Sequence, residues 1–295
     1  MVLSIIIMGR KLWDYRNDIE ISFNISMIVQ LVLCCLLFAG VVYMCPYIYK
    51  KMLYITVQKD IEYSKVAHIY CKSNVMKYLP GNVMQYIGRN ELAVQEDIPH
   101  SKVALATILE VVVVVISTML VAVLFSLSYT IEWVSKFVDF NKEFFVVVII
   151  LVIFVAAMLF LVLKKRLLNY IKDIFTWKNI LIFFGTILYN SIIIILNSCI
   201  YFYVLYLLGI SMNASNYLAG IGLYALAFVL GYITPGVPGG IGIRETVLVY
   251  FFSSFVLEAQ ILTGALVFRI VSVIGDFLGL GIAIIVNQMY KLKQK

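Results

Sequence analysis

Two polar interruptions in an otherwise apolar sequence carry the residues that could bind a ligand. The first, Tyr78 to Glu91, reads YLPGNVMQYIGRNE, and the second, Thr234 to Glu245, reads TPGVPGGIGIRE. Such stretches loosen the helix and leave backbone groups unpaired, so in a membrane they persist only inside the protein or along a wet cavity. Their glycines and prolines include Pro80, Gly81, Pro238, Gly239, Gly240 and Gly242, and their charged residues include Arg89, Glu91, Arg244 and Glu245.

A membrane helix that contains a charge follows each interruption. Glu110 lies 30 residues after Pro80, and Arg269 lies 31 residues after Pro238. The two halves thus look like an internal repeat, with opposite charges at corresponding positions of the two membrane helices. Paired Pro/Gly-broken segments mark the central site of many transporters. We therefore predict that 80–100 and 237–257 are broken or re-entrant helices that meet near the middle of the bundle.

Charged side chains inside apolar runs cost about 2.5–3.5 kcal/mol each, so they are functional candidates by default. Arg269 and Asp276 share one helical face because they lie seven residues apart. We expect Glu110 to form an ion pair with Arg269 or Arg244, since an isolated buried charge is too costly. The candidate substrate-binding residues are Arg89, Glu110, Arg244, Glu245, Arg269 and Asp276.

Other interpretations of these residues stay open. The glycines could serve only the close approach of packed helices, and the charges could serve only to neutralise one another. In the functional interpretation, the free N–H groups after Gly242 attract an anion such as a lipid phosphate. Tyr201, Tyr203 and Tyr206 are predicted to form an interfacial belt rather than a sugar site. The cysteines and histidines lack ligand spacing, so we expect no metal, cofactor or catalytic residue.

Composition identifies the environment of the chain. Of the 295 residues, 63% are hydrophobic and 13% are charged, and the mean hydropathy is +1.00. Ordinary soluble domains are about 45–50% apolar and about 25% charged. We therefore predict an all-α, multi-pass helical bundle in the cell (cytoplasmic) membrane. The net charge of +7 lies in short loops, as in cytoplasmic membrane loops, so we expect no nucleic-acid partner.

The apolar runs predict six to seven crossings. The basic segments 50–77 and 164–178 are expected in the cytoplasm, and the lysines of the C-terminal tail favour the same side, which requires 237–257 to cross as a broken helix. Residues 1–22 form a short N-terminal segment, with a truncated first helix as one interpretation, and 23–295 form the membrane domain. The runs are 23–49, 103–127, 144–163, 181–208, 217–234 and 261–287, with a shorter one at 245–257.

These motifs resemble a known family. KYLPGNVMQYIGR followed by PHSKVALATILE, and TPGVPGGIGIRE followed by TGALVFRIVSV, are similar to the two signature regions of the lysylphosphatidylglycerol synthase transmembrane-region family. The resemblance implies the flippase-like membrane domain of the multiple peptide resistance factor and its free-standing relatives. The family's usual first helix is reduced here to a short apolar stretch, and the soluble aminoacyl-transferase domain of the long members has no counterpart.

The resulting hypothesis is transport or flipping of a lipid with a polar or anionic headgroup in envelope biogenesis. The lipid would be a phospholipid, an aminoacylated phospholipid or a lipid-linked glycan, and a partner enzyme of envelope lipid or polysaccharide synthesis is a further expectation. One alternative is a lipid-modifying transferase that uses Glu110 or Glu245 as acid or base. Another is an accessory subunit of a glycan-assembly enzyme. The residues favour a protein without enzymatic activity but leave the transferase open.

Overall fold

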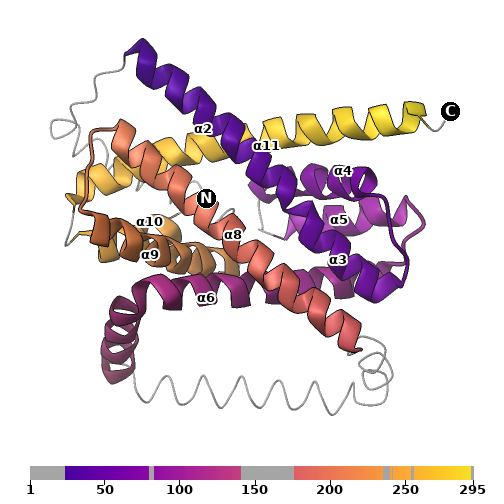
Figure 1. The fold of residues 1–295 in the computed structure, drawn as a ribbon, viewed down its shortest axis with the longest axis horizontal. Helices are drawn as coiled ribbons and strands as arrows, with labels where there is room; N and C mark the ends of the chain where they lie inside the picture. The colour runs from indigo at the N-terminus through magenta and orange to yellow at the C-terminus, as the bar shows by residue number, and fades with distance from the viewer. Residues whose placement is uncertain are drawn as a thin grey trace.

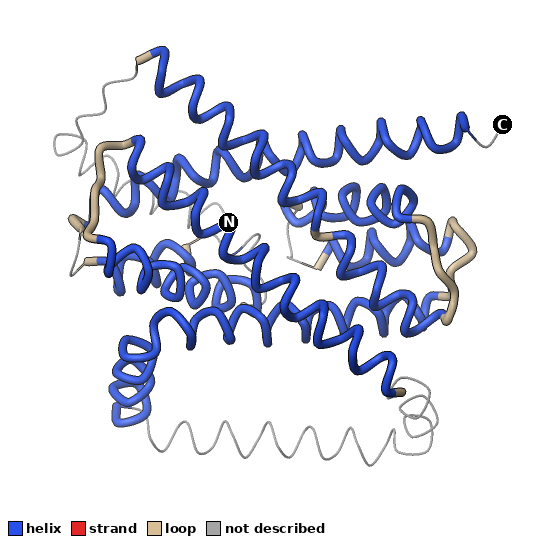
Figure 2. The backbone as a smooth tube through the Cα atoms, viewed as in Figure 1, coloured by secondary structure: helices blue, strands red, loops and turns tan. Residues whose placement is uncertain are grey.

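The described chain is built from helices. The computed structural model describes residues 24–79, 83–127, 176–234, 240, 242–253 and 256–293, together with the backbone of 128–140. These ranges contain no strand (Figure 2), which confirms the all-α prediction. The elements are α2 (Ile25–Met44), α3 (Pro46–Val57), α4 (Tyr63–Asn74), the 3-10 turn η1 (Val75–Tyr78), α5 (Met84–Val94), α6 (His100–Phe140), α8 (Trp177–Leu207), α9 (Ala214–Ile233), α10 (Ile243–Phe252) and α11 (Glu258–Lys293).

Five helical stretches are long and apolar enough to cross a membrane, as expected of a multi-pass membrane protein. They match five of the six long apolar runs in the sequence, and the sixth, 144–163, lies outside the described residues. The crossing count and the internal repeat therefore stay predictions. The stretches are Ile25–Val57, His100–Leu127, Trp177–Leu207, Ala214–Ile233 and Glu258–Lys293.

Two pairs of neighbouring helices flank the Pro/Gly segments. Helix α4 packs against α5, and α9 packs against α10. Figure 1 shows α4 and α5 on the right of the molecule and α9 and α10 on the left. With 11 and 10 residues, α5 and α10 rise only about 15–17 Å, whereas the hydrocarbon core is about 30 Å thick. Neither short helix can therefore span a membrane alone.

The described lysines of the basic segments lie toward one end of the bundle. Lys178, at the start of α8, donates a hydrogen bond of 2.7 Å to the hydroxyl of Tyr54, near the end of α3. Ala283, in the last third of α11, packs with Ala67 of α4. The lysine-bearing end of α11 therefore lies on the same side as segment 50–77, as the charge pattern predicts. The side of the membrane on which this end lies stays a prediction.

An aromatic cluster forms part of the core. The ring of Tyr201 is fully buried and lies 5.2 Å from the ring of Tyr224 and 5.4 Å from that of Phe268. The predicted interfacial belt is therefore wrong for Tyr201. Tyr203 and Tyr206 are exposed, because positions three apart share one face of a helix and Tyr201 lies on another.

Helices α2 and α11 cross at close range through two glycines (Figure 1). A Cβ atom on Gly275 would lie 2.6 Å from Cδ1 of Phe38, and one on Gly279 would lie 2.8 Å from Cγ1 of Val42. The two glycines are four residues apart, so they lie on the same face of α11. Small residues at such positions let two membrane helices approach closely.

This contact gives a prediction for stability. Gly275→Leu should lower the free energy of unfolding by about 1–3 kcal/mol, because the new side chain would push α2, with its Phe38, away from α11. The matched control is Gly281→Leu on the same helix, where a Cβ atom would meet nothing within 4 Å. Thermal unfolding in detergent measures both variants, and equal stabilities would contradict the proposed packing.

Candidate functional site

A cavity lies in the middle of the bundle, between the two helix pairs. Asn74 and Gln85 line it from the α4–α5 pair, and Gly231 and Arg244 line it from the α9–α10 pair. Its volume is about 160 Å³, which is room for several water molecules or a phosphate-sized group. The described parts of 80–100 and 237–257 thus approach a common site, as predicted, while 80–82, 235–239 and 241 lie outside the described residues.

The first buried ion pair joins α5 to α6. Arg89 donates a hydrogen bond from Nη1 to the carboxylate of Glu110, and both side chains are almost completely buried. The guanidinium carbon also lies 4.1 Å from the ring centre of Tyr70 and 4.8 Å from that of Tyr49, so aromatic faces replace part of its hydration. Glu110 lines the cavity and Arg89 does not. Arg89 therefore supports the wall and does not face the ligand space.

The second ion pair joins α10 to α11 with the charges exchanged, and it combines a buried Glu245 with a partly buried Arg269. Nε of Arg269 donates to Oε1 of Glu245 at 2.8 Å. The other oxygen of Glu245 accepts a hydrogen bond of 2.6 Å from the backbone N–H of Gly242, which precedes α10. A carboxylate in the first turn also interacts favourably with the helix dipole. In each half of the chain, a short helix is thus tied to the long helix that follows it.

The expected pairing of Glu110 with Arg269 or Arg244 is wrong. Glu110 pairs with Arg89, and Arg269 pairs with Glu245. The two residues of each pair are 21 and 24 residues apart in the sequence. Each pair therefore joins a short helix to the next helix along the chain. The spacing of the motifs identified the charges, but partner choice depends on helix rotation, which the spacing does not define.

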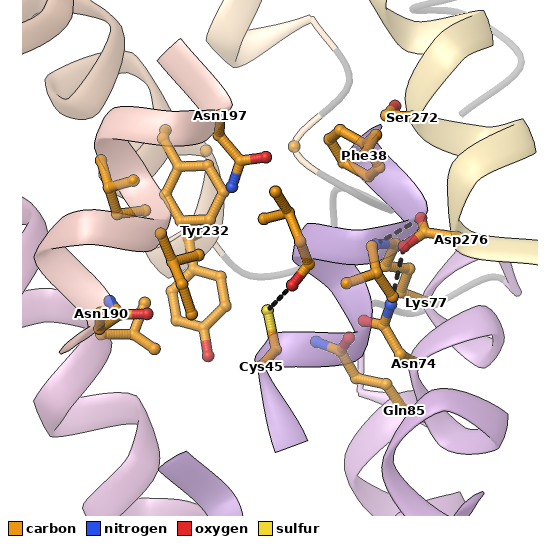
Figure 3. A pocket seen from close by; sticks show the side chains of 18 of the residues that line it. Phe38, Cys45, Asn74, Lys77, Gln85, Asn190, Asn197, Tyr232, Ser272 and Asp276 are labelled. Atoms are coloured by element: carbon orange, nitrogen blue, oxygen red, sulfur yellow. Dashed lines mark hydrogen bonds and ion pairs between the residues drawn. The ribbon is translucent and has the colours of Figure 1, made fainter. Parts of the chain in front are cut away.

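Asp276 is the centre of a third polar cluster. Its carboxylate forms an ion pair of 2.7 Å with Nζ of Lys77 and accepts hydrogen bonds of 2.9 Å from Asn74 and 2.5 Å from the hydroxyl of Tyr78. Figure 3 shows Asp276 beside Lys77 and Asn74 at the cavity wall. The cluster ties α11 to the turn of the α4–α5 pair. None of these three partners is among the candidate site residues predicted from the sequence. Asn74 and Lys77 belong to the basic segment 50–77, and Tyr78 begins the first polar interruption.

Arg244 differs from the other arginines at the site. Within the described residues its guanidinium forms no ion pair, and its Nε is buried without a hydrogen-bond partner. The group stacks 4.3 Å from the ring centre of Phe228 and lines the cavity. No carboxylate of the described residues therefore forms an ion pair with Arg244, although its guanidinium lines a cavity inside the bundle.

Two glycines make room for Arg244. A Cβ atom on Gly231 would lie 2.5 Å from Cγ of Arg244, and one on Gly240 would lie 2.9 Å from the carbonyl oxygen of Gly231. Gly240 and Gly242 have positive φ angles of 70° and 90°, which favour glycine. The close-packing interpretation of these glycines is thus compatible with a binding site. Pro80, Gly81, Pro238 and Gly239 lie outside the described residues.

Amide side chains form the opposite wall of the cavity. Asn190 and Asn197 of α8 face the cluster around Asp276 across the space in Figure 3. Asn190 donates to the hydroxyl of Ser117 at 2.5 Å, whereas Oδ1 of Asn197 is buried and has no hydrogen-bond partner among the described residues. Sequence reasoning missed this wall. The available signal was two asparagines seven residues apart in an apolar run, which places both on one helical face.

Residues 19–279 match the family model described as the lysylphosphatidylglycerol synthase TM region. The match includes both Pro/Gly segments, the three clusters of charged residues and Arg244. No curated protein matches the sequence.

The ion pair between α5 and α6 gives a second prediction. Glu110→Gln should lower the free energy of unfolding by about 3–5 kcal/mol, because it leaves the Arg89 charge buried without a counter-charge. The double variant Arg89→Met/Glu110→Leu should recover most of that loss, since apolar pairs of similar volume often replace buried ion pairs. A double-mutant cycle on thermal unfolding in detergent measures both. A single variant as stable as the wild type would show that the pair does not hold the wall.

Proposed function

Because this chain belongs to the lysylphosphatidylglycerol synthase TM region family, we propose that it moves a lipid across the cytoplasmic membrane during envelope biogenesis. The lipid has an anionic, phosphate-bearing headgroup, which enters the central cavity while its tail stays in the bilayer. The family match supports a membrane domain with a lipid-related role. The cavity geometry supports the headgroup class and the transport step.

Arg244 is the observation that carries the proposal. The other charged side chains that line the cavity, Lys77, Glu110, Arg269 and Asp276, each have an opposite charge as partner. Arg244 adds one positive charge without such a partner among the described residues. A guanidinium has a planar set of donors that matches phosphate geometry. An anionic headgroup would therefore supply the counter-charge that the protein does not.

The carboxylates favour transport over lipid chemistry. A transferase of the kind considered above needs an acid or base that is free to exchange a proton with its substrate. Glu110 and Glu245 each have an arginine partner, and Glu245 also accepts a backbone hydrogen bond. Both carboxylates are thus already engaged in holding helices together.

The proposal predicts a selective loss of transport. Arg244→Gln should reduce transport of phosphatidylglycerol in sealed vesicles about tenfold or more, because a charge-assisted hydrogen bond contributes about 1.5–3 kcal/mol. Arg244→Lys should recover little, since an ammonium cannot bind phosphate bidentately. Unfolding temperatures should stay near that of the wild type, because no carboxylate in the described structure loses its partner.

Two controls accompany this measurement. Lys72→Gln removes one positive charge from an exposed position of α4 outside the cavity and should transport normally. Arg269→Ala leaves Glu245 without its partner and should lose folded protein as well as transport. Normal transport by Arg244→Gln would refute the headgroup site. Lipid turnover by the purified protein in detergent would support the transferase, and stoichiometric co-purification with a glycan-assembly enzyme, without transport, would support the accessory subunit.

A further inference from the structure

A second hollow lies on the outside of the bundle, between α5 and α6. This lateral groove has a volume of about 620 Å³. The residues that line it are Tyr86, Ile87, Asn90 and Glu91 of α5 and His100, Ala104, Thr107, Ile108, Val111 and Val112 of α6. The volume lies within the range of about 300–1,000 Å³ that is typical of sites for small ligands. Ile87, Ile108 and Val112 line it and are exposed. Its α6 side belongs to a candidate membrane span, His100–Leu127, so we expect lipid chains to reach this side of the groove.

The lateral groove and the central cavity share one wall. On α5, Gln85 faces the cavity, and the next residue, Tyr86, faces the groove. On α6, Glu110 faces the cavity, and the next residue, Val111, faces the groove. The two spaces are thus separated by the thickness of the α5–α6 pair, which the ion pair of Glu110 with Arg89 holds together.

Helix α6 of this wall packs extensively against α9, and one hydrogen bond links α5 to α9. The hydroxyl of Tyr86 donates a hydrogen bond of 3.2 Å to the hydroxyl of Tyr232, which lines the cavity. At this hydrogen bond, a side chain that lines the groove meets one that lines the cavity.

The charges in the two spaces suit different parts of a lipid. The described residues that line the groove include the carboxylate of Glu91 and no lysine or arginine, so the groove disfavours a phosphate. The cavity holds Arg244 and suits a phosphate but has about a quarter of the volume. Most of the groove lining on α6 is apolar, which suits a hydrocarbon chain.

We propose that the lateral groove binds an acyl chain of the lipid whose headgroup occupies the central cavity. This inference rests on the proposed function and adds where the tail lies during transport. The lipid would pass between the two spaces at Tyr86 and Tyr232. An annular lipid without a fixed place on the surface is the competing occupant.

The test combines labelling and transport in vesicles. Phosphatidylglycerol with a photoreactive diazirine in its acyl chain is incorporated into vesicles together with the wild-type protein. The vesicles are irradiated, and the labelled peptides are mapped by mass spectrometry. Labels should concentrate on 86–91 and 104–112. Ile108→Trp should fill the groove, remove this labelling and lower transport about tenfold or more. The matched control is Leu124→Trp, because both residues are exposed on α6, at 60% for Ile108 and 69% for Leu124, and Leu124 lies outside the groove.

The outcomes separate this inference from the proposed function. Equal labelling around Ile108 and Leu124, or normal transport by Ile108→Trp with an unchanged unfolding temperature, would overturn the groove. A wild-type protein that transports no phospholipid would overturn the proposed function, while the labelling pattern would still decide whether the groove holds a chain. Selective labelling with loss of transport in Ile108→Trp alone would support both.

Discussion

The cost of an unpaired charge inside the bundle determines how the two short helices are placed. Both α5 and α10 are too short to span the bilayer, so neither can be fixed by the hydrophobic effect alone. Arg89 of α5 pairs with Glu110, and Glu245 of α10 pairs with Arg269. Breaking a buried pair is costly because it leaves one charge without compensation. The pairs therefore hold both short helices against the long helices that follow them.

The same constraint distinguishes supporting charges from a binding charge. Charges that hold the fold need their partners in the protein, as Asp276 has Lys77, Asn74 and Tyr78. A charge that serves a ligand must lack such a partner until the ligand arrives. Arg244 meets this second condition within the described structure, and its stacking on Phe228 keeps the guanidinium oriented meanwhile.

The sequence predicted the composition of the site better than its contacts. The Pro/Gly segments and the buried charges were recognisable because such residues are rare in apolar runs. The partners of Glu110 and Arg269 were assigned wrongly, since a helix can be rotated without any change in spacing. Lys77 is not predicted as a site residue, because its segment has the charge pattern of a cytoplasmic loop. Tyr201 is predicted at the membrane interface because Tyr203 and Tyr206 follow it closely, but only those two tyrosines are exposed. Each error concerns the direction of a side chain, which follows from packing between distant helices.

The glycine contact of α11 with α2 also has a mechanical consequence. With 36 residues, α11 is a rod about 54 Å long, and Gly275 and Gly279 hold it near its middle. Arg269 lies on one arm of this rod, the lysine-bearing end lies on the other, and Asp276 lies close to the point of contact. A rod held near its middle moves its two arms in opposite directions. Rocking of α11 about the glycines would thus displace Arg269 at the cavity while leaving Asp276 almost in place.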